Sequence, residues 1–581
     1  ATVPKTQVKL EAYTYSDSIF SGRIFVQNID YTKIVTVYWS DASNKWDSSK
    51  YYTEAAYTHS IPGTNYEYWD FSATIGPSGI KQFYISYQVR GVTYYDNNGG
   101  YGVNYDVISS PPTTSDATTI PTTTTSAIPS STTTIPASTG VPSGNSTITV
   151  WADSQHKISW KAMLANINPP GSATGFIAAS LSTSGPDYYY AWTRDAAMVA
   201  HVIVNAYNTT KAGDATTLGV LKDFVTFQIK AMATSTVCNC LGEPKFNPDG
   251  SSYTGPWGRP QNDGPAERAT TFILFADSYL SQTGDAAYVT TLKRAIFTDL
   301  DYVVTTWQDN CFDLWEEVNG LHMYTLAVMR RSLVDGASFA ARNGDNTRAS
   351  TYTNTAKSIE TKLASFYNSS SNYVVVTKNF AGGVNKAGLD TSTLIAANTA
   401  GLGDGFFTPG SPEILATAAA IEKSFADLYG INKQIPNWLG TAIGRYPEDT
   451  YNGNGNSQGN PWFICTATFA ELYYRAILEW QHAGSVTVNN VNLPFFKKFD
   501  SSTSSGTTYT VGTSSFDSLI SKVAYAADNF FSTIKYHAAT NGSMSEQFNR
   551  DTGFMTGARD LTWSHAAFIT AAKAKAGTPV Y

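Results

Sequence analysis

The segment FDLWEEVNG, residues 312–320, places three carboxylates and an indole within five consecutive residues. In a helix, Asp313, Glu316 and Glu317 would share one face, because they are spaced i, i+3 and i+4. Neighbouring carboxylates and a bulky aromatic side chain both raise a carboxyl pKa. A carboxylic acid that stays protonated near neutral pH is the proton donor that glycosidic bond cleavage requires. The pattern also fits an acidic first turn that complements a helix dipole.

The chain around this segment has a helical pattern from Trp151 onward. Ten segments carry apolar side chains at helical spacing, separated by Gly- and Asn-rich loops. They are Ala196–Tyr207, Leu218–Ala233, Glu267–Ser281, Ala286–Asp309, Tyr324–Ala341, Thr347–Phe366, Pro412–Tyr429, Pro461–Gln481, Ser514–Phe531 and Asp560–Ala574. Because no strand precedes each helix, the pattern predicts a large all-α domain rather than a βα barrel. The intervening loops are rich in Trp, Tyr, Arg and carboxylates, which is typical of an active site on a helical scaffold.

A second carboxylate is needed for glycosidic cleavage, either to activate water or to attack the sugar. We expect it in another loop of the same kind. Glu546, in GSMSEQFNR, follows a Gly/Ser-rich turn and is our candidate. An ordinary surface glutamate would also fit this position.

Residues 1–106 alternate apolar and polar side chains over short segments separated by turn residues, which predicts an all-β module. In the strand KQFYISYQV the apolar face takes alternate positions, so Tyr84 points to the other side. Trp46 lies in the polar stretch SNKWDSSK, and Tyr94 and Tyr95 precede asparagines that offer hydrogen-bonding amides. Several exposed aromatic rings beside amide groups indicate a carbohydrate-binding surface.

A sharp change of composition separates this module from the helical part. Thr, Ser and Pro dominate the segment SPPTTSDATTIPTTTTSAIPSSTTTIPASTG, which holds one charge, Asp116, and no aromatic residue. Such a segment cannot bury enough apolar surface to fold and predicts an extended, O-glycosylated linker. We therefore expect a binding module at 1–106, a linker at 107–147 and a catalytic domain at 148–581. A tethered module would raise the local concentration of the catalytic domain on a polymer.

Bulk composition narrows the function classes. Charged residues make up 15% and aromatic residues 13% of the chain, with 36 Tyr and 13 Trp, a balance that suits surfaces stacking on sugar rings. The net charge of −7 and the lack of a basic run argue against nucleic acid as a partner. Without an apolar run of 18 residues, we expect no membrane contact and a mature, secreted, extracellular product. No H-E-x-x-H or C-x-x-C motif occurs, and we expect no metal or other cofactor.

The cysteines and glycosylation sequons leave several possibilities open. Cys465 lies in an apolar helical pattern and fits a buried thiol, whereas Cys311 could pair with Cys238 or Cys240. N-x-S/T sequons permit glycosylation at Asn145, Asn208, Asn368 and Asn541. Because a glycan on Asn541 would crowd Glu546, we expect that sequon to be unused or to point away.

Eight motifs occur in the order found in fungal glucoamylases, glycoside hydrolase family 15, and the chain from Trp151 to Ala574 resembles that family. The motifs are WTRDAA, GEPKFN, GPWGRPQNDGPAERA, DLWEEVNG, GRYPEDTYNGN, NPWF, SMSEQ and ARDLTWSHAA. The N-terminal module is similar to family 21 starch-binding domains, in the layout of Rhizopus-like glucoamylases from mucoralean fungi. The resemblance implies an (α/α)6 barrel, with six inner helices wrapped by six outer ones, preceded by an immunoglobulin-like β-sandwich.

The resemblance also implies roles for individual residues. Glu316 resembles the general acid, Glu546 the general base, and Glu317 a substrate ligand. Further substrate-binding roles are implied for Tyr188, Trp192, Arg194, Asp195, Lys245, Trp257, Asp313, Trp315, Arg445, Asp449, Trp462, Gln547 and Trp563. The starch-binding surface of the N-terminal module is assigned to Tyr31, Trp46, Tyr84, Tyr94, Tyr95, Asn97 and Asn98. Core packing of the tryptophans and a structural ion pair between Arg194 and Asp195 are the alternatives.

The expected activity is that of an exo-acting glucan 1,4-α-glucosidase, which releases β-glucose from non-reducing chain ends with inversion and acts more slowly on α-1,6 linkages. Its substrates would be starch, glycogen and maltooligosaccharides, and we expect a monomer. Inversion implies that the two carboxyl groups lie roughly 6.5–9.5 Å apart. The loop YNGNGNSQGNPWF is longer than the YNGNPWF spacing typical of the family, which leaves the preference for chain length open.

Two other functions are also compatible with the sequence. One is another family 15 activity, of the glucodextranase or trehalase kind, which a starch-binding module disfavours. The other is a catalytically silent starch-binding protein, which the presence of both glutamates disfavours.

Overall fold

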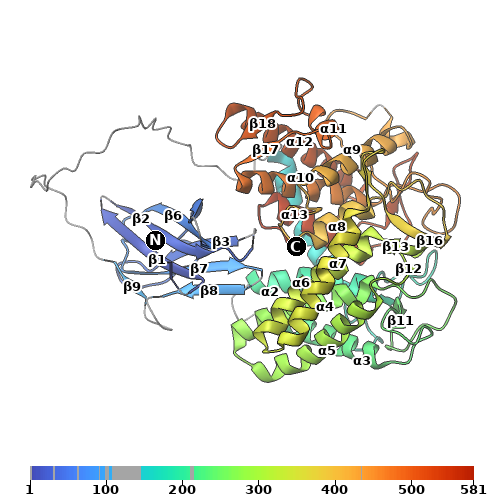
Figure 1. Ribbon diagram of the computed structural model, residues 1–581, viewed down its shortest axis with the longest axis horizontal. Coiled ribbons are helices and arrows are strands. Elements are labelled where there is room, and N and C mark those ends of the chain that lie inside the picture. The colour runs from blue at the N-terminus through green and yellow to red at the C-terminus, as the bar shows by residue number, and fades with distance from the viewer. Residues whose placement is uncertain are drawn as a thin grey trace, which may run out of the picture. The chain divides into compact units, whose positions relative to one another are not determined.

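The computed structural model describes residues 3–107, apart from 5, 17, 31–32, 62–63, 91 and 98–103, and residues 146–581, apart from 210–214 and 434. The chain forms two compact units, Ala1–Pro136 and Ala137–Tyr581 (Figure 1). Most of the predicted linker at 107–147 lies outside the described residues, so its boundaries stay a prediction.

The first unit is a β-sandwich of two antiparallel sheets. One sheet has the strand order β1 (Val8–Ser16), β2 (Ile19–Gln27), β6 (Tyr66–Thr74), β5 (Ala56–Ser60). The other has the order β4 (Tyr52–Glu54), β3 (Lys33–Trp39), β7 (Gln82–Val89), β8 (Val92–Asp96), and β9 (Tyr105–Asp106) also pairs with β7. The predicted alternation is confirmed, because Phe83, Ile85 and Tyr87 are fully buried, whereas Tyr84 between them is only partly buried.

The second unit is a double-layered barrel of helices (Figure 1). Its inner helices contact one another in a closed ring, in the order α2 (Thr193–Thr209), α4 (Asp263–Thr283), α6 (Met323–Arg342), α8 (Ser392–Ala400), α10 (Phe463–Ala483), α13 (Thr562–Lys575). An outer helix packs against each of them in turn, namely α3 (Ala215–Ala233), α5 (Ala286–Thr306), α7 (Asn346–Ala364), α9 (Pro412–Ala426), α12 (Ser514–His537) and α1 (Ser146–Ala165). The (α/α)6 barrel implied by the resemblance is therefore confirmed.

Two of these helices are absent from the ten segments predicted by periodicity. In α8 every residue except Thr399 is buried, so the sequence shows no polar face and no helical period. The helix α1 begins with Ser-Thr-Ile-Thr-Val, whose β-branched residues have low helix propensity. Both helices are stabilised by packing on the barrel rather than by local sequence preference.

The loops of the barrel hold short elements. These are β10 (Ala191–Trp192), β11 (Lys245–Phe246), β12 (Cys311–Phe312), β13 (Val318–His322), β14 (Tyr367–Asn368), β15 (Tyr373–Val374), β16 (Thr377–Gly383), β17 (Ser485–Thr487), β18 (Thr508–Thr510), β19 (Gln547–Phe548), β20 (Met555–Thr556), α11 (Leu493–Lys497) and the 3-10 turn η1 (Gly430–Asn432). The pairs β10–β11, β12–β13 and β19–β20 fix the loops that lead into three inner helices.

The segment of residues 312–320 is not helical, so its carboxylates do not share the face that a helix would give them. It forms the turn of a hairpin between β12 and β13. The Asp313 carboxylate accepts hydrogen bonds from the backbone N–H groups of Glu317 (2.8 Å) and Val318 (2.9 Å). A side chain that binds nearby backbone in this way competes with helix formation. Strand β13 also pairs with β16 on its other side, which further favours the extended conformation.

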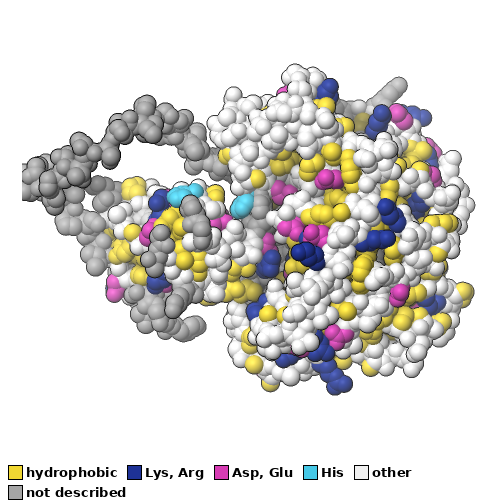
Figure 2. Space-filling model, viewed as in Figure 1, with side chains coloured by type: hydrophobic (Ala, Val, Ile, Leu, Met, Phe, Trp, Pro, Cys, Tyr) yellow, Lys and Arg dark blue, Asp and Glu magenta, His cyan; other side chains and the backbone are white. Residues whose placement is uncertain are grey.

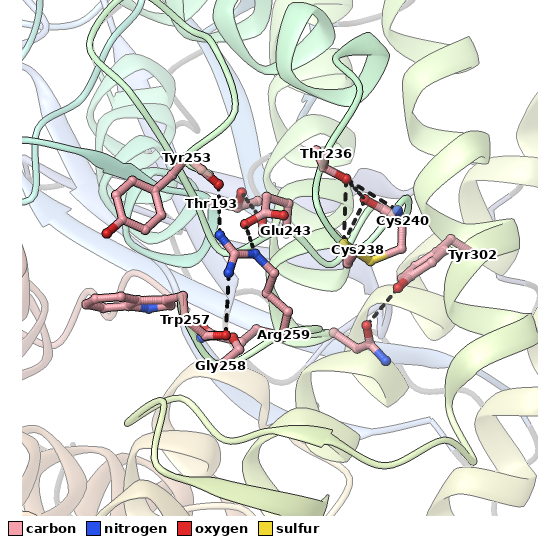
Figure 3. Close-up of a disulfide and its surroundings, with 12 residues drawn as sticks. Thr193, Thr236, Cys238, Cys240, Glu243, Tyr253, Trp257, Gly258, Arg259 and Tyr302 are labelled. Carbon is pink, nitrogen blue, oxygen red and sulfur yellow. Dashed lines mark hydrogen bonds and ion pairs between the residues drawn. A yellow bond between two sulfur atoms is a disulfide. The ribbon is translucent and has the colours of Figure 1, made fainter. Parts of the chain in front are cut away.

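Neither pairing considered for Cys311, with Cys238 or with Cys240, occurs. Cys238 and Cys240 form a disulfide with each other, with Cα atoms 5.2 Å apart (Figure 3). Cys311 and Cys465 are buried free thiols, which confirms the prediction for Cys465. The turn at Thr236–Cys240 brings the first two thiols together locally, whereas Cys311 lies in β12.

The surface agrees with the low charge of the sequence. Figure 2 shows basic and acidic side chains in small groups over the visible face of the second unit, without a broad patch of either sign. Within the described ranges, no helix combines the length and the hydropathy needed to cross a membrane.

Candidate functional site

The loops that lead from an outer helix into the next inner helix meet around one pocket. The pocket has a volume of about 440 Å³. Most of the predicted site residues line it. They are Tyr188, Trp192, Arg194, Asp195, Trp257, Trp315, Glu316, Glu317, Arg445, Trp462, Glu546 and Trp563.

Sequence reasoning missed several side chains that also line the pocket. These are Asp187, Leu314, Tyr451, Asn454 and Leu561. Four of them belong to the aromatic-rich loops that the sequence marks as functional, whereas Leu561 lies in the segment predicted as the last helix, Asp560–Ala574. Their position in those loops was the available signal, but a single Tyr, Asn or Leu has no chemistry that distinguishes it from its neighbours.

Glu316 has an asymmetric environment. Its Oε2 atom accepts hydrogen bonds from Trp192 Nε1 (3.0 Å), Gln261 Nε2 (2.7 Å) and Trp257 Nε1. Among the described residues, no side chain or backbone group hydrogen-bonds to Oε1. Because three donors occupy the lone pairs of Oε2, a proton on this carboxyl group belongs on Oε1. The backbone at Glu316 has φ 68°, a left-handed conformation that is uncommon outside glycine.

A buried ion network holds the turn that carries Glu316. Lys386 lies 3.2 Å from Asp313 and 2.8 Å from Asp390, and Trp315 Nε1 donates to the same Asp390 (2.9 Å). Although burial opposes it, the Lys386 ammonium and the Glu317 backbone N–H keep the pKa of Asp313 below its usual range. Asp313 does not line the pocket. It caps the turn that presents the two glutamates.

Glu317 belongs to a second network on the other side of the turn. Its Oε1 accepts from Arg445 Nη2 (2.7 Å), and its Oε2 accepts from the Tyr446 hydroxyl (2.5 Å). Arg445 also makes a bidentate pair with Asp449 at 2.7 and 2.8 Å. Burial raises the pKa of Glu317, and the Arg445 guanidinium opposes that rise. Asp449 therefore orients Arg445 from behind, while Glu317 and Arg445 line the pocket.

Glu546 approaches from the loop that precedes α13. It is 1% exposed, and burial raises the pKa of its carboxyl group, while hydrogen bonds from Tyr188 and Gln547 oppose the rise. Gln547 Nε2 lies 3.0 Å from Glu546 Oε2, and Gln547 Oε1 accepts from Asn460 Nδ2 (3.0 Å). Gln547 is fully buried and does not line the pocket, so it holds Glu546 rather than a ligand.

Arg194 and Asp195 begin helix α2 at the floor of the pocket. Arg194 Nη1 contacts Asp263 and Gln261, each at 3.0 Å, whereas its buried Nε has no hydrogen-bond partner. Arg194 Nε lies 3.5 Å from Asp195 Oδ1, which is an ion-pair contact. Burial raises the pKa of Asp195 to about 6. The ion pair considered as an alternative is present, but both residues also line the pocket and are available to a ligand.

Aromatic rings form the walls. The rings of Trp315 and Trp563 stack with centroids 6.2 Å apart, and Trp462 lies 5.5 Å from Trp315. The Tyr188 and Tyr451 hydroxyls are 2.9 Å apart. These tryptophans are 5–7% exposed, so they pack in the core and line the pocket at once. In the described parts of the chain, no three His, Cys, Asp or Glu side chains are grouped so that they could hold a metal ion.

Three of the residues predicted to bind starch form one aromatic surface on the first unit. Tyr84 lies 5.5 Å from Trp46 and 6.1 Å from Tyr95 between ring centroids, and Trp46 and Tyr95 are 37% and 57% exposed. Tyr94 instead packs against Tyr87, on the core side, because successive strand residues point to opposite faces. Asn97 is partly buried. Tyr31 and Asn98 lie outside the described residues.

The sequon residues differ in exposure. Asn368 and Asn541 are exposed, Asn208 is partly buried, and Asn145 lies outside the described residues. Asn541 lines a groove beside α1 and is not among the residues of the pocket that holds Glu546. Glycosylation of any sequon stays a prediction.

Comparisons with known proteins agree with this architecture. A family model for glycosyl hydrolases family 15 matches residues 157–573, and one for the carbohydrate/starch-binding module (family 21) matches residues 2–108. The chain is 62% identical over its whole length to Glucoamylase 1 of Rhizopus oryzae and spans 96% of that protein. Among solved structures, it resembles a family 15 glucoamylase from Hypocrea jecorina, with 34% identity, TM-score 0.69, and 74% and 73% of the two chains covered. The glucoamylase of Saccharomycopsis fibuligera gives 30% identity, TM-score 0.68, and coverage of 76% and 98%.

The matched ranges coincide with the helical barrel and with the β-sandwich. The resemblance drawn from the motifs is confirmed on both parts of the chain. The chain therefore belongs to glycosyl hydrolases family 15 and carries an N-terminal starch-binding module of family 21.

Proposed function

We propose that Glu316 and Glu546 are the two catalytic carboxylates of this exo-acting glucan 1,4-α-glucosidase, with Glu316 as general acid and Glu546 as general base. The enzyme releases glucose from the non-reducing ends of starch and maltooligosaccharides with inversion. The observation that best supports the assignment is the environment of Glu316, whose Oε2 is occupied by three N–H donors while Oε1 stays available.

In the proposed mechanism, Glu316 Oε1–H donates its proton to the glycosidic oxygen as the bond to the anomeric carbon breaks. The negative charge that remains on the carboxylate is shared with Oε2, where the Trp192, Trp257 and Gln261 N–H groups stabilise it. Hydrogen bonds to a charged acceptor are stronger than those to a neutral one, so these contacts favour the state that follows proton transfer.

Glu546 completes the reaction by removing a proton from a water molecule on the opposite face of the sugar. The water oxygen attacks the anomeric carbon in a single displacement, which inverts the configuration and yields β-glucose. A raised pKa makes the ionised Glu546 carboxylate a stronger base. The Tyr188 and Gln547 donors keep it ionised over a wider pH range than burial alone would allow.

We assign the terminal glucose to the floor of the pocket. Arg194 Nε is a buried donor that lacks a hydrogen bond, although it lies 3.5 Å from Asp195 Oδ1, and a sugar hydroxyl can satisfy it while Asp195 serves as an acceptor. Glu317 and Arg445 would bind the hydroxyls of the next glucose unit. The aromatic walls exclude water and pack against the apolar faces of the sugar rings.

Replacing Gln547 with Leu should move the acidic limb of the kcat/KM pH profile to higher pH by about one unit. The Gln547 N–H donor favours the ionised form of Glu546, so its loss raises the pKa of that base further. A hydrogen bond to a charged group is worth about 1.5–3 kcal/mol, and one pKa unit corresponds to about 1.4 kcal/mol. With a higher pKa, a smaller fraction of the enzyme carries ionised Glu546 at any acidic pH. The profile is measured with maltose as substrate.

The alkaline limb is the internal control for this variant and should stay in place, because its position depends on the pKa of the general acid and not on that of the base. An acidic limb that stays in place, or one that moves to lower pH, would contradict the role of Glu546 as base.

For the N-terminal module, we propose that Trp46, Tyr84 and Tyr95 form the surface that stacks on starch. The Trp46→Ala variant should adsorb to granular starch about tenfold more weakly, which corresponds to the loss of about 1.4 kcal/mol from one stacking residue. Its turnover of maltotriose should not change, because the pocket is formed by the second unit alone. Adsorption isotherms measure the first quantity and glucose release the second.

A matched control is Tyr525→Ala, which removes a ring of similar exposure, 40%, from helix α12. It should leave both quantities unchanged. If Trp46→Ala adsorbed as well as the unaltered enzyme, the surface we assign would not be the starch contact.

We further propose that the enzyme is a secreted monomer in which residues 107–147 tether the two domains. The absence of a charged patch on the visible face of the second unit and the aromatic surface of the first both suit a neutral polysaccharide substrate.

A further inference from the structure

Lys245 lies behind the wall of the pocket. It belongs to β11, where it pairs with Trp192 of β10, and its side chain is 2% exposed. It is not among the residues that line the pocket, although the family resemblance suggests a substrate ligand at this position. Its function must therefore depend on the groups that surround it.

Four aromatic rings enclose the Lys245 ammonium. Its Nζ atom lies 3.4 Å from the ring centroid of Trp257, 4.1 Å from Tyr253, 4.3 Å from Tyr190 and 4.7 Å from Trp192. The rings also contact one another edge to face around the ammonium, with centroid distances of 5.3–6.3 Å. They form a closed aromatic cage, which we define by these four residues.

The cage supplies the direct contacts of the ammonium, while the Glu316 and Asp187 carboxylates attract it from beyond ion-pair distance. Within the described residues, Lys245 makes no ion pair within 4.0 Å. Burial lowers the pKa of its ammonium to about 8. A cation is attracted to the faces of aromatic rings, and the attraction grows when the pair is removed from water. The ammonium therefore fixes the rings, and the rings fix the ammonium.

Two of the cage residues touch the proposed proton donor. Trp192 and Trp257 both donate their indole N–H groups to Glu316 Oε2. An indole ring that rotates about its side-chain torsions carries its N–H away from a fixed acceptor. The orientation of both rings thus decides whether the Glu316 carboxylate is stabilised.

The backbone of the loop between α3 and α4, which carries Tyr253 and Trp257, is held by contacts that do not involve Lys245. The Arg259 guanidinium binds Glu243 (2.6 Å) and the carbonyl oxygens of Tyr253 (2.8 Å) and Gly255 (2.9 Å), as Figure 3 shows for Glu243 and Tyr253. Figure 3 also shows Tyr253 and Trp257 on the same side of this clamp. Loss of the Lys245 charge should accordingly change the orientation of the rings and leave the loop backbone in place.

We infer that Lys245 is a positioning residue for the proton donor: its ammonium holds Trp192 and Trp257 in the orientation in which their N–H groups bind Glu316. The inference rests on the proposed role of Glu316 as general acid. Lys245 itself contacts neither the pocket nor a reacting atom.

The test compares two substrates that differ in their need for a proton. Maltose has a leaving group that must be protonated, whereas the nitrophenolate of 4-nitrophenyl α-glucoside leaves without protonation. In Lys245→Met and Lys245→Gln, kcat/KM for maltose should fall by about 10- to 100-fold, as expected for a misplaced catalytic group. The value for the nitrophenyl substrate should fall by only a few fold. Lys245→Arg, which keeps a cation in the cage, should recover part of the loss on maltose.

Lys222→Met is the matched control. Lys222 lies 4.9 and 5.0 Å from the rings of Tyr279 and Tyr288, so it also makes cation–π contacts, but it lies outside the pocket. Its ratio of the two kcat/KM values should equal that of the unaltered enzyme. Because each ratio is taken within one sample, a loss of folded enzyme cancels.

Glu316→Gln is measured in the same assay to separate the two hypotheses. If it loses both activities equally, the assignment of the acid is wrong. If it loses maltose hydrolysis selectively but the neutral Lys245 variants do not, the acid is correct and the inference about Lys245 is overturned.

Discussion

Glu316→Gln should lower kcat on maltoheptaose by about 10³-fold, because general acid catalysis contributes about 10²–10⁴-fold. Glutamine has the size of glutamate, and its amide oxygen can still accept the N–H groups that bind Oε2. The pocket keeps its shape, but the group has no proton that it can transfer to the leaving oxygen. Stopped assays of glucose release measure the loss.

Adsorption to granular starch should be unchanged in this variant, since the aromatic surface of the first unit is intact. Glu360→Gln is a suitable control, because Glu360 lies on the outer helix α7, does not line the pocket, and makes a partly exposed ion pair with Arg330 of α6. Full activity of Glu316→Gln would show that another group donates the proton.

Glu546→Ala should reduce hydrolysis of maltoheptaose by about 10²–10⁴-fold, for a different reason. Without the carboxylate, no group accepts the proton of the attacking water. Alanine also leaves space where the carboxylate stood, so a small anion such as azide can enter. Azide attacks without losing a proton and therefore needs no base.

With α-glucosyl fluoride as substrate, azide should restore turnover of Glu546→Ala and yield β-glucosyl azide. The fluoride leaving group needs little protonation, so the rate of this reaction depends mainly on the attack of the nucleophile on the anomeric carbon. Glu316→Gln in the same mixture should form no azide adduct, because Glu546 still fills its position. Absence of rescue in Glu546→Ala, or an α-glucosyl azide product, would contradict the assignment of the base.

The sequence predicted the outer scaffold best where one face of an element meets water. Alternation in β7 places Phe83 and Ile85 inside and Tyr84 outside, and the structure confirms it. Five of the six outer helices were found for the same reason, whereas α1 was not. Helix α8 was not, because a helix buried on all sides carries no periodic signal.

The turn at residues 312–320 shows the limit of local patterns. The i, i+3, i+4 spacing of its carboxylates fits a helix, but the Asp313 side chain binds the backbone of Glu317 and Val318 instead. Pairing of β13 with β16, more than fifty residues later in the chain, completes the hairpin. Such a distant partner cannot be identified from the nine residues themselves.

Most of the chemically distinctive residues predicted for the site line the pocket, whereas the lysines that support it are not identified as supports by the sequence. Lys386, which joins Asp313 to Asp390, belongs to no motif quoted from the sequence. Lys245 was predicted as a ligand, yet its ammonium is enclosed by four rings behind the wall. A lysine that lines a pocket cannot be distinguished in the sequence from one that is buried beneath it, because only tertiary packing decides where the side chain lies.

Early-time proton NMR of the anomeric region during digestion of maltoheptaose shows directly which anomer of glucose the enzyme releases first. β-Glucose alone should appear, before mutarotation produces the α-anomer, because Glu546 directs water to the face opposite the leaving group. α-Glucose as the first product would mean retention of configuration and would remove the water-activating role from Glu546. Short oligosaccharides as first products would mean internal cleavage and contradict exo action.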